Sequence, residues 1–153
     1  MINALNFQAI TCLHTNPGEY RPCPVTVGDY VPPDHYRVHA LMDDFINVVN
    51  RIWDSTDPVV LAAWVLWRMN LIHPFINGNG RTARASSYFV LCVKSGGWLP
   101  GKTILPELIV RERVSYVEAL KHADNSMKTG PEDVSKLHAL MSRLLEEQLS
   151  TAA

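Results

Sequence analysis

Hydrophobic residues recur every three to four positions through most of the chain, which is the spacing of amphipathic helices. Pro32-Pro33-Asp34 resembles a helix entry, and an apolar stripe follows it up to Ile52. Asp57-Pro58 then supplies an N-cap followed by proline at the first helical position. The helix predicted from there to Ile72 is apolar on nearly every side, so we expect it at the centre of the domain.

Four further segments fit the same helical period. They are a short helix within residues 1–14, a helix from Arg81 to Ser95 that stops at Gly96-Gly97, a long helix from Leu105 to Ala123, and a last helix opened by Gly130-Pro131. The chain is therefore predicted to be all-α, with a bundle-like helical core.

Residues 18–32 follow a different pattern. Asn16-Pro17-Gly18 is turn chemistry. After it, Tyr20, Val25, Val27 and Tyr30 suggest an extended piece that two prolines interrupt. Proline cannot donate a hydrogen bond to a sheet ladder, so such a segment fits only at an edge. We expect a small β-hairpin that projects from the helices as a flap.

Composition indicates one ordered domain over residues 1–153. Apolar residues make up 47% of the chain and charged residues 19%, enough hydrophobic material for a core. The formal net charge of -1 gives no field that would draw nucleic acid or an anionic membrane to the whole molecule. We therefore expect neither nucleic acid nor a membrane as a partner.

Cysteine usage and hydropathy suggest a cytoplasmic protein. An odd number of cysteines is a poor disulfide framework, and their spacing fits no metal site. The longest apolar stretch, Val59 to Ile72, is interrupted by Arg68 and Asn70 and is too short to cross a bilayer. Reduced thiols are the simple interpretation of Cys12, Cys23 and Cys92.

The segment that carries candidate chemistry is the loop 73–84, which reads HPFINGNGRTAR. Gly78 and Gly80 can take positive φ, which lets successive backbone N–H groups converge on an anion at the start of the next helix. Arg81 and Arg84 can bind phosphate from the same side. Positive charge opposes the dipole at a helix N-terminus, and a bound anion would resolve that conflict. His73 lies beside this loop as a candidate general base.

Simpler interpretations exist for each part of this loop. A histidine at a helix end is often only a dipole partner, arginine stems often cover a helix flank, and a lone G-x-G is weak. Phe75 is expected to pack the loop onto the core. The conjunction of His, Gly, Asn and Arg within twelve residues favours an anion site with a base.

Other candidates carry less weight. His35 and His39 are one helical turn apart and are a minor candidate for a metal pair. Trp53, Trp64 and Trp67 lie among aliphatic residues and are expected in the core.

Residues 73–84 closely resemble the signature of the Fic family, H-P-F-x-[DE]-G-N-G-R-x-x-R, with eleven of twelve positions matching or unconstrained. Gly18-Glu19-Tyr20-Arg21 and the segment from Val25 to Pro33 resemble the family's flap. The resemblance extends over most of the chain and implies a Fic-type helical bundle.

The resemblance implies a protein adenylyltransferase that uses ATP. In this family the motif histidine, matched by His73, deprotonates a Ser, Thr or Tyr hydroxyl of a target protein, which attacks the α-phosphate. Asn79 and Gly80 match residues that hold phosphate oxygens. Arg81 matches the residue on the β- or γ-phosphate, and Arg84 the arginine that orients the nucleotide. The family's flap docks the target as an added strand.

Asn77 is the one departure from the signature, because the family has Asp or Glu there to bind Mg²⁺. An amide oxygen can ligate Mg²⁺, or Mn²⁺ in its place, but it brings no negative charge. We expect Asn77 to be a weak metal ligand. The departure leaves open a Fic enzyme that transfers phosphate, phosphocholine or another nucleotide, and a non-catalytic domain that binds a nucleotide or a protein.

Inhibition in many relatives comes from a helix with an [ST]-x-x-x-E-[GN] motif. Ser142 to Glu146 matches its first five positions, but Glu147 occupies the last. A separate inhibitory protein, or none, is therefore favoured over inhibition by Glu146.

Overall fold

The protein is all-α in the computed structural model, which describes residues 1–152. The described residues form seven α-helices and one short 3₁₀ helix, and they contain no β-strand beyond isolated bridges. The elements are α1 (Ile2–Ile10), η1 (His35–Arg37), α2 (Val38–Ile52), α3 (Pro58–Ile72), α4 (Asn79–Lys94), α5 (Leu105–Arg111), α6 (Arg113–Thr129) and α7 (Ser135–Ser150).

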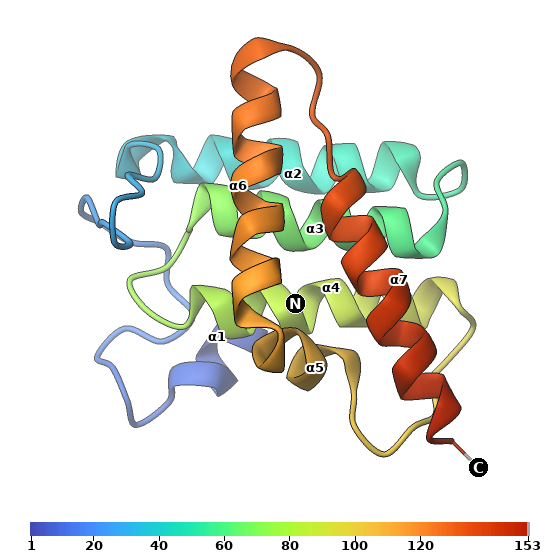
Figure 1. Ribbon diagram of the computed structural model, residues 1–153. Coiled ribbons are helices and arrows are strands. Elements are labelled where there is room, and N and C mark those ends of the chain that lie inside the picture. The colour runs from blue at the N-terminus through green and yellow to red at the C-terminus, as the bar shows by residue number, and fades with distance from the viewer. Residues whose placement is uncertain (153) are drawn as a thin grey trace.

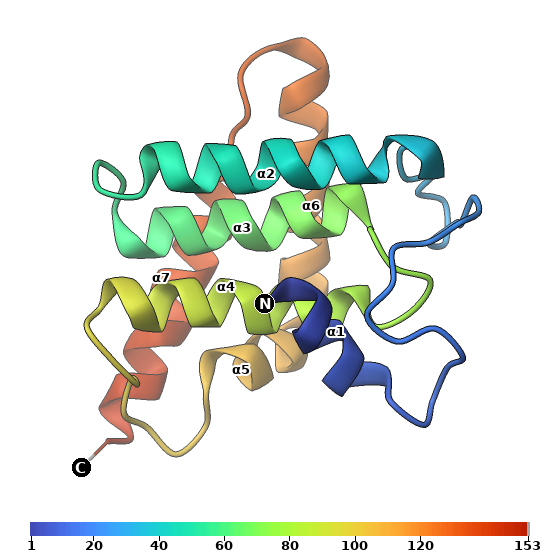
Figure 2. The same ribbon diagram turned by 180° about the vertical axis from the view of Figure 1, so that it is seen from behind.

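The helices are arranged in layers around α3 and α4. Helices α2, α3 and α4 lie side by side, while α6 and α7 cross them on one face (Figure 1). Helix α1 packs against α4 on the opposite face, as the view from behind shows (Figure 2). The loop 73–78 joins two central helices, so it is held by the core at both ends.

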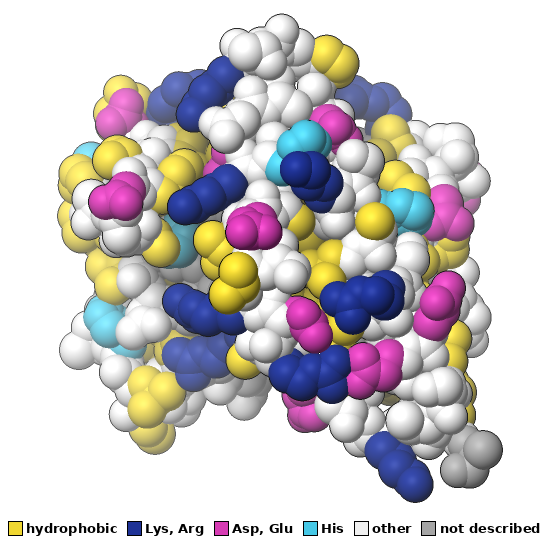
Figure 3. All heavy atoms as spheres, in the orientation of Figure 1, with side chains coloured by type: hydrophobic (Ala, Val, Ile, Leu, Met, Phe, Trp, Pro, Cys, Tyr) yellow, Lys and Arg dark blue, Asp and Glu magenta, His cyan; other side chains and the backbone are white. Residues whose placement is uncertain are grey.

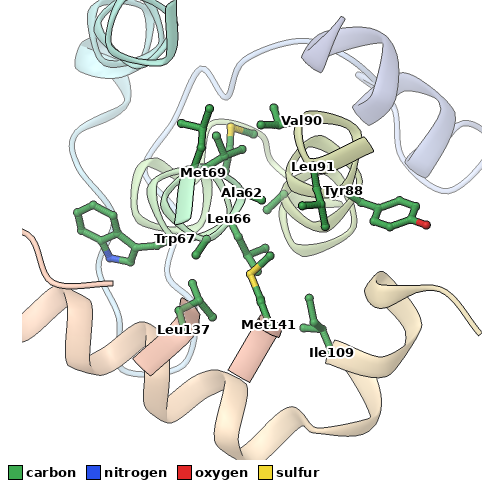
Figure 4. Packing of buried hydrophobic residues seen from close by; sticks show 14 of the residues in the cluster. Ala62, Leu66, Trp67, Met69, Tyr88, Val90, Leu91, Ile109, Leu137 and Met141 are labelled. Atoms are coloured by element: carbon green, nitrogen blue, oxygen red, sulfur yellow. The ribbon is translucent and has the colours of Figure 1, made fainter. Parts of the chain in front are cut away.

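Helix α3 forms the middle of the core, as its apolar sequence predicts. The Asp57 side chain accepts hydrogen bonds from the backbone N–H groups of Val59 (2.8 Å) and Val60 (3.1 Å), and Pro58 follows it at the first helical position. Figure 4 shows side chains of α3 packed between α4 and α7. Trp67 is fully buried, while Trp53 and Trp64 are half-buried against the same core.

Charged side chains of both signs are interspersed over the face that carries α6 and α7 (Figure 3). One exposed pair there is bidentate: the Arg111 guanidinium donates to both Glu147 carboxylate oxygens at 2.7 and 2.6 Å. Within residues 1–152, no helix has the length and apolar character needed to cross a membrane.

The single helix expected from Leu105 to Ala123 is wrong, because the chain breaks at Glu112. Its backbone leaves the helical region there (φ -90°, ψ 37°), which separates α5 from α6. The break lets α5 and α6 each turn their own buried face to the core, and no glycine or proline marks it in the sequence. The last helix also begins later than expected, at Ser135.

The hairpin expected at residues 18–32 is not confirmed. The described residues have isolated antiparallel bridges there instead of paired strands, Tyr20 with Phe75 and Val27 with Tyr30. The Arg21 N–H donates to the Pro74 carbonyl, but Pro74 has no N–H to return the bond, so the pairing stays short. The segment is an extended loop that first pairs with the loop after α3, at Tyr20 and Phe75, and then makes a tight turn between Val27 and Tyr30.

The connection between α6 and α7 is predicted to make stability depend on acid pH. Hydrogen bonds from Ser135 first, and then from His122 (2.8 Å), lower the pKa of Asp133 from 3.8 to about 2. A lowered carboxyl pKa stabilises the fold above the unfolded value, and that stabilisation is lost as pH falls through the folded value. The melting temperature of Asp133→Asn should lie below that of the wild type at pH 6, and the two should converge between about pH 4 and pH 2.

The matched control for that comparison is Asp54→Asn, at an exposed carboxylate outside the connection. It should leave the melting temperature unchanged across the same pH range. A deficit in Asp133→Asn that is equally large at pH 2 and pH 6 would contradict the role given to the ionised carboxylate.

Candidate active site

The loop after α3 begins with a sharp change of backbone direction at His73. This residue ends α3 in the left-handed conformation (φ 51°, ψ 58°), and its N–H donates to the Met69 carbonyl at 3.0 Å. Left-handed backbone is uncommon for residues other than glycine, although histidine is among those enriched there. The chain is thereby turned away from the helix axis toward the start of α4.

A pocket of about 340 Å³ lies over this loop, and every residue that lines it comes from 73–84. It brings together the residues that the sequence singles out except Phe75, which is fully buried beneath. The lining consists of His73, Ile76, Asn77, Gly78, Asn79, Gly80, Arg81 and Arg84.

The two glycines of the loop act differently, contrary to the expectation that both take positive φ. Gly78 does so (φ 77°), but Gly80 lies in the first turn of α4, which begins at Asn79. A Cβ atom on Gly80 would lie 3.2 Å from Arg84 Nη1, so glycine there leaves room for the guanidinium.

The first turn of α4 leaves backbone donors open to the pocket. The Thr82 N–H donates to the Gly78 carbonyl at 2.9 Å and is the first in the helical series. The N–H groups of Asn79, Gly80 and Arg81 precede it and have no acceptor in their own helix. N–H groups in this arrangement are suited to binding an anion.

The Asn79 side chain braces the loop. It is buried, its Oδ1 accepts from the Phe75 N–H at 2.9 Å, and its Nδ2 donates to the Phe75 carbonyl at 2.7 Å. Both ends of the amide are therefore used within the loop, which leaves the backbone N–H of Asn79 as its contribution to the pocket.

Asn77 is exposed, and its Oδ1 already accepts the Gly78 N–H at 2.6 Å. Within residues 1–152, no cluster of three or more His, Cys, Asp or Glu side chains could hold a metal. The residues present do not form a Mg²⁺ site by themselves. The minor candidates His35 and His39 lie against tyrosine rings instead, at 5.8 and 5.0 Å between centroids.

His73 has the electrostatic environment of a neutral base. Burial lowers the pKa of its imidazole, a hydrogen bond with the Asn70 backbone raises it, and the positive charge of Arg21 lowers it again. The balance lies below the ordinary value of 6.5. At neutral pH the ring is therefore unprotonated and able to accept a proton.

Both arginines line the pocket while keeping contacts with the fold. Arg81 Nη1 donates to the Ala9 carbonyl, near the C-terminal end of α1, at 2.5 Å. The charge of Arg84 acts on the buried Tyr116 hydroxyl, whose pKa is raised by burial and partly lowered by that charge. Both residues bring positive charge to the pocket from its α4 side.

Two buried polar residues, Asn6 and Arg21, hold the loop from outside, and the sequence did not indicate this role for either. Asn6 Nδ2 donates to the Asn77 carbonyl (2.9 Å) and to Thr82 Oγ1 (3.1 Å). Arg21 donates to the His73 carbonyl at 2.8 Å. These partners lie 52 to 76 residues away along the chain, so no local pattern points to them.

Glu146 does not reach this site. It is exposed on α7 and is not among the residues that line the loop pocket. In the part of the chain that the structure describes, no ion pair joins it to Arg84.

Gly78→Ala is predicted to destabilise the fold through crowding against α1. The new Cβ would lie 2.4 Å from Ile10 Cγ2 and 3.1 Å from Asn6 Nδ2, in left-handed backbone. We expect a loss of about 1–3 kcal/mol in the free energy of unfolding, measured by urea denaturation. Gly28→Ala is the control, because its φ of 58° is similar and nothing lies within 4 Å. Equal losses in the two variants would contradict the crowding.

The fold and the loop together define a helical domain that places a histidine and the N-terminus of a helix at one pocket. The chain belongs to the Fic/DOC family, which it matches over residues 2–91. It is 36% identical over 115 residues to the protein adenylyltransferase Fic of Drosophila willistoni and 35% identical to that of Drosophila melanogaster. Each match covers 72% of this chain and 22% of the relative, so the chain spans about a fifth of the length of these relatives.

Solved structures share the fold along almost the whole chain. A Fic family protein from Desulfovibrio desulfuricans G20 superposes with a TM-score of 0.76 and 22% identity, over 97% of this chain and 45% of that protein. Fic-1 (residues 134–508) from C. elegans gives 0.77 and 24%, over 97% and 41%. The helices beyond residue 91 therefore also belong to the shared architecture.

Proposed function

We propose that this protein is an adenylyltransferase that moves AMP from ATP onto a Ser, Thr or Tyr hydroxyl of a target protein. Its membership of the Fic/DOC family and its similarity to proteins named protein adenylyltransferase Fic support this activity. The observation that carries the proposal is one pocket lined by the half-buried His73, the first turn of α4 and two arginines.

The reaction uses these groups in complementary ways. His73 takes the proton of the target hydroxyl, and that oxygen forms a bond to the α-phosphorus of ATP. The bond from the α-phosphorus to the bridging oxygen breaks, and its electron pair leaves with pyrophosphate. The N–H groups at the start of α4 hold phosphate oxygens as charge develops, and Arg81 and Arg84 bind the phosphates.

A larger groove beside the loop suits the nucleoside of ATP. It has a volume of about 670 Å³, and its wall includes Ile72, the residue before His73. The groove lies between the 29–33 segment and α6, with Leu71 and Asp124 in its lining. The Tyr30 hydroxyl donates to the Leu71 carbonyl at 2.6 Å and fixes one side. Its volume and mixed lining are those of a small-molecule site.

Mg²⁺, or Mn²⁺, enters this proposal only as the ion that accompanies the ATP phosphates. Asn77 brings no charge to it, and no step of the reaction above depends on a metal ligand from the protein.

The target protein is proposed to dock along residues 18–32. Val27 and Val31 are exposed in this segment, at 45% and 72% of their full area. An extended backbone with unpaired groups can take an added strand from a partner. A separate inhibitory protein is a second proposed partner, because Glu146 of this chain does not line the loop pocket.

Arg84→Met is predicted to weaken ATP binding by about 10- to 100-fold, because it removes charge-assisted hydrogen bonds worth about 1.5–3 kcal/mol. Calorimetric titration with ATP measures the change. Arg51→Met, at an exposed position on α2, is the control and should bind ATP like the wild type. Unchanged affinity in Arg84→Met would remove this arginine from the nucleotide site.

Labelled ATP tests the transferred group. The protein is incubated with α-labelled or γ-labelled ATP, Mg²⁺ or Mn²⁺ and a cell lysate, beside a His73→Ala control. Label from the α position that depends on His73 supports AMP transfer. Label from the γ position alone would identify a kinase. No label from either position, despite ATP binding, would favour the second candidate, a non-catalytic nucleotide-binding domain, for which Asn77 is the specific observation.

A further inference from the structure

Arg21 is a buried arginine in the extended segment between α1 and η1, with 3% of its area exposed. Its Nε donates to the His73 carbonyl at 2.8 Å, and its backbone N–H donates to the Pro74 carbonyl, also at 2.8 Å. The guanidinium further donates to the carbonyls of Cys23 and Pro33. One residue therefore holds two successive carbonyls of the loop that follows α3.

A buried guanidinium without a paired carboxylate is unusual, because arginine is seldom fully buried unless paired. Within residues 1–152, no ion pair includes Arg21, and the side-chain hydrogen bonds given above all go to backbone carbonyls. Burial lowers the pKa of its guanidinium, and Cys23, Tyr30 and Asp34 partly offset that effect. Burying this charge costs free energy of desolvation, so we expect Arg21 to have a role at this place that offsets the cost.

That role is to hold the backbone of His73. Left-handed backbone at a residue other than glycine is strained, and it persists only where the surrounding structure holds it. The Met69 carbonyl holds the N–H of His73, and Arg21 holds its carbonyl. We propose that Arg21 is the positioning residue of His73, fixing the backbone from which the imidazole projects and placing a permanent positive charge beside it.

The charge has a second consequence for the base. The positive charge of Arg21 lowers the pKa of His73, in addition to the larger effect of burial. The other charged groups at the loop pocket are Arg81 and Arg84 on α4, and no carboxylate lines that pocket among the described residues. Burial, and then the Asp43 carboxylate on α2, raise the pKa of Tyr20. The centroid of the Tyr20 ring lies 5.6 Å from that of Phe75. Arg21 is therefore the charge that acts on His73 from outside the motif.

The inference rests on the proposed role of His73 as a base, but its first test is a titration that needs no ATP and no target. The pKa of His73 is measured by NMR titration of its ring protons in the wild type, Arg21→Lys, Arg21→Met and the surface control Arg51→Met. Loss of the positive charge in Arg21→Met should move the pKa upward. Arg21→Lys keeps the charge and should keep the pKa low, and Arg51→Met should match the wild type.

The lysine variant separates position from charge. Lysine offers one compact ammonium group, which cannot reproduce the planar fork of arginine. We expect label transfer from ATP to fall about 10- to 100-fold in Arg21→Lys, as for a misplaced catalytic group. An unchanged or lower His73 pKa in folded Arg21→Met would overturn the inference, as would full transfer by Arg21→Lys. If the wild type transfers nothing, the proposed function fails, while the titration still decides the effect of Arg21.

A measurement on the wild type alone covers the case in which Arg21→Met does not fold. The Nε–H proton of Arg21, which binds the His73 carbonyl, should exchange with water more slowly than that of Arg51. Its chemical shift should also follow the titration of His73. Rapid exchange at the Arg51 rate, or a shift that ignores His73, would overturn the inference.

Discussion

Replacing His73 by alanine is expected to lower the rate of AMP transfer by about 10²–10⁴-fold, the usual contribution of a general base. ATP binding should persist, because the open N–H groups and both arginines of α4 lie outside the substitution. The fold should also persist, since His73 is only half-buried and alanine retains the backbone N–H bonded to Met69. Rates of α-label incorporation, measured beside ATP affinity by calorimetry, give the two quantities.

His138→Ala is the matched control, at a half-buried histidine of α7 outside the loop pocket. It should keep the wild-type rate and affinity. Transfer by His73→Ala at the rate of the wild type would show that another group takes the proton, or that proton removal does not limit the reaction.

Asn77→Asp is expected to raise transfer about 10-fold at low Mg²⁺, because a carboxylate is the protein ligand through which Mg²⁺ usually enters such sites. The gain should shrink at saturating Mg²⁺, where charge on the ligand matters less. Asn77 is exposed, and an aspartate oxygen can still accept the Gly78 N–H, so stability should change little. Initial rates across a Mg²⁺ series measure the effect.

Asn50→Asp serves as the control for that series, since it adds the same charge at an exposed position on α2. Equal gains from both substitutions would indicate a general effect of net charge. No gain from Asn77→Asp at any Mg²⁺ concentration would count against slow AMP transfer limited by the missing carboxylate.

Local patterns were sufficient to predict most of the fold. The Asp57-Pro58 cap and the apolar residues up to Ile72 predict α3 at its observed position, because capping and helical period are properties of neighbouring residues. The loop 73–84 was predicted as a unit for the same reason, and its residues do line one pocket.

Features that depend on distant contacts were not predictable. The break at Glu112 has no glycine or proline and follows from how α5 and α6 each pack on the core. The helical Gly80 was missed because the start of α4 at Asn79 depends on cap geometry rather than composition. The hydrogen bond from Arg21 to the His73 carbonyl joins residues 52 positions apart, so no spacing rule reveals it.

Peptide mass spectrometry tests the central claim most directly. A cell lysate is incubated with ATP, Mg²⁺ and either the wild type or His73→Ala, and the proteins are digested and searched for modified hydroxyl groups. We predict peptides with AMP joined through a phosphoester to Ser, Thr or Tyr in the wild-type sample alone. Peptides that carry phosphate without the nucleoside, or no modified peptide although the protein binds ATP, would contradict AMP transfer by this site.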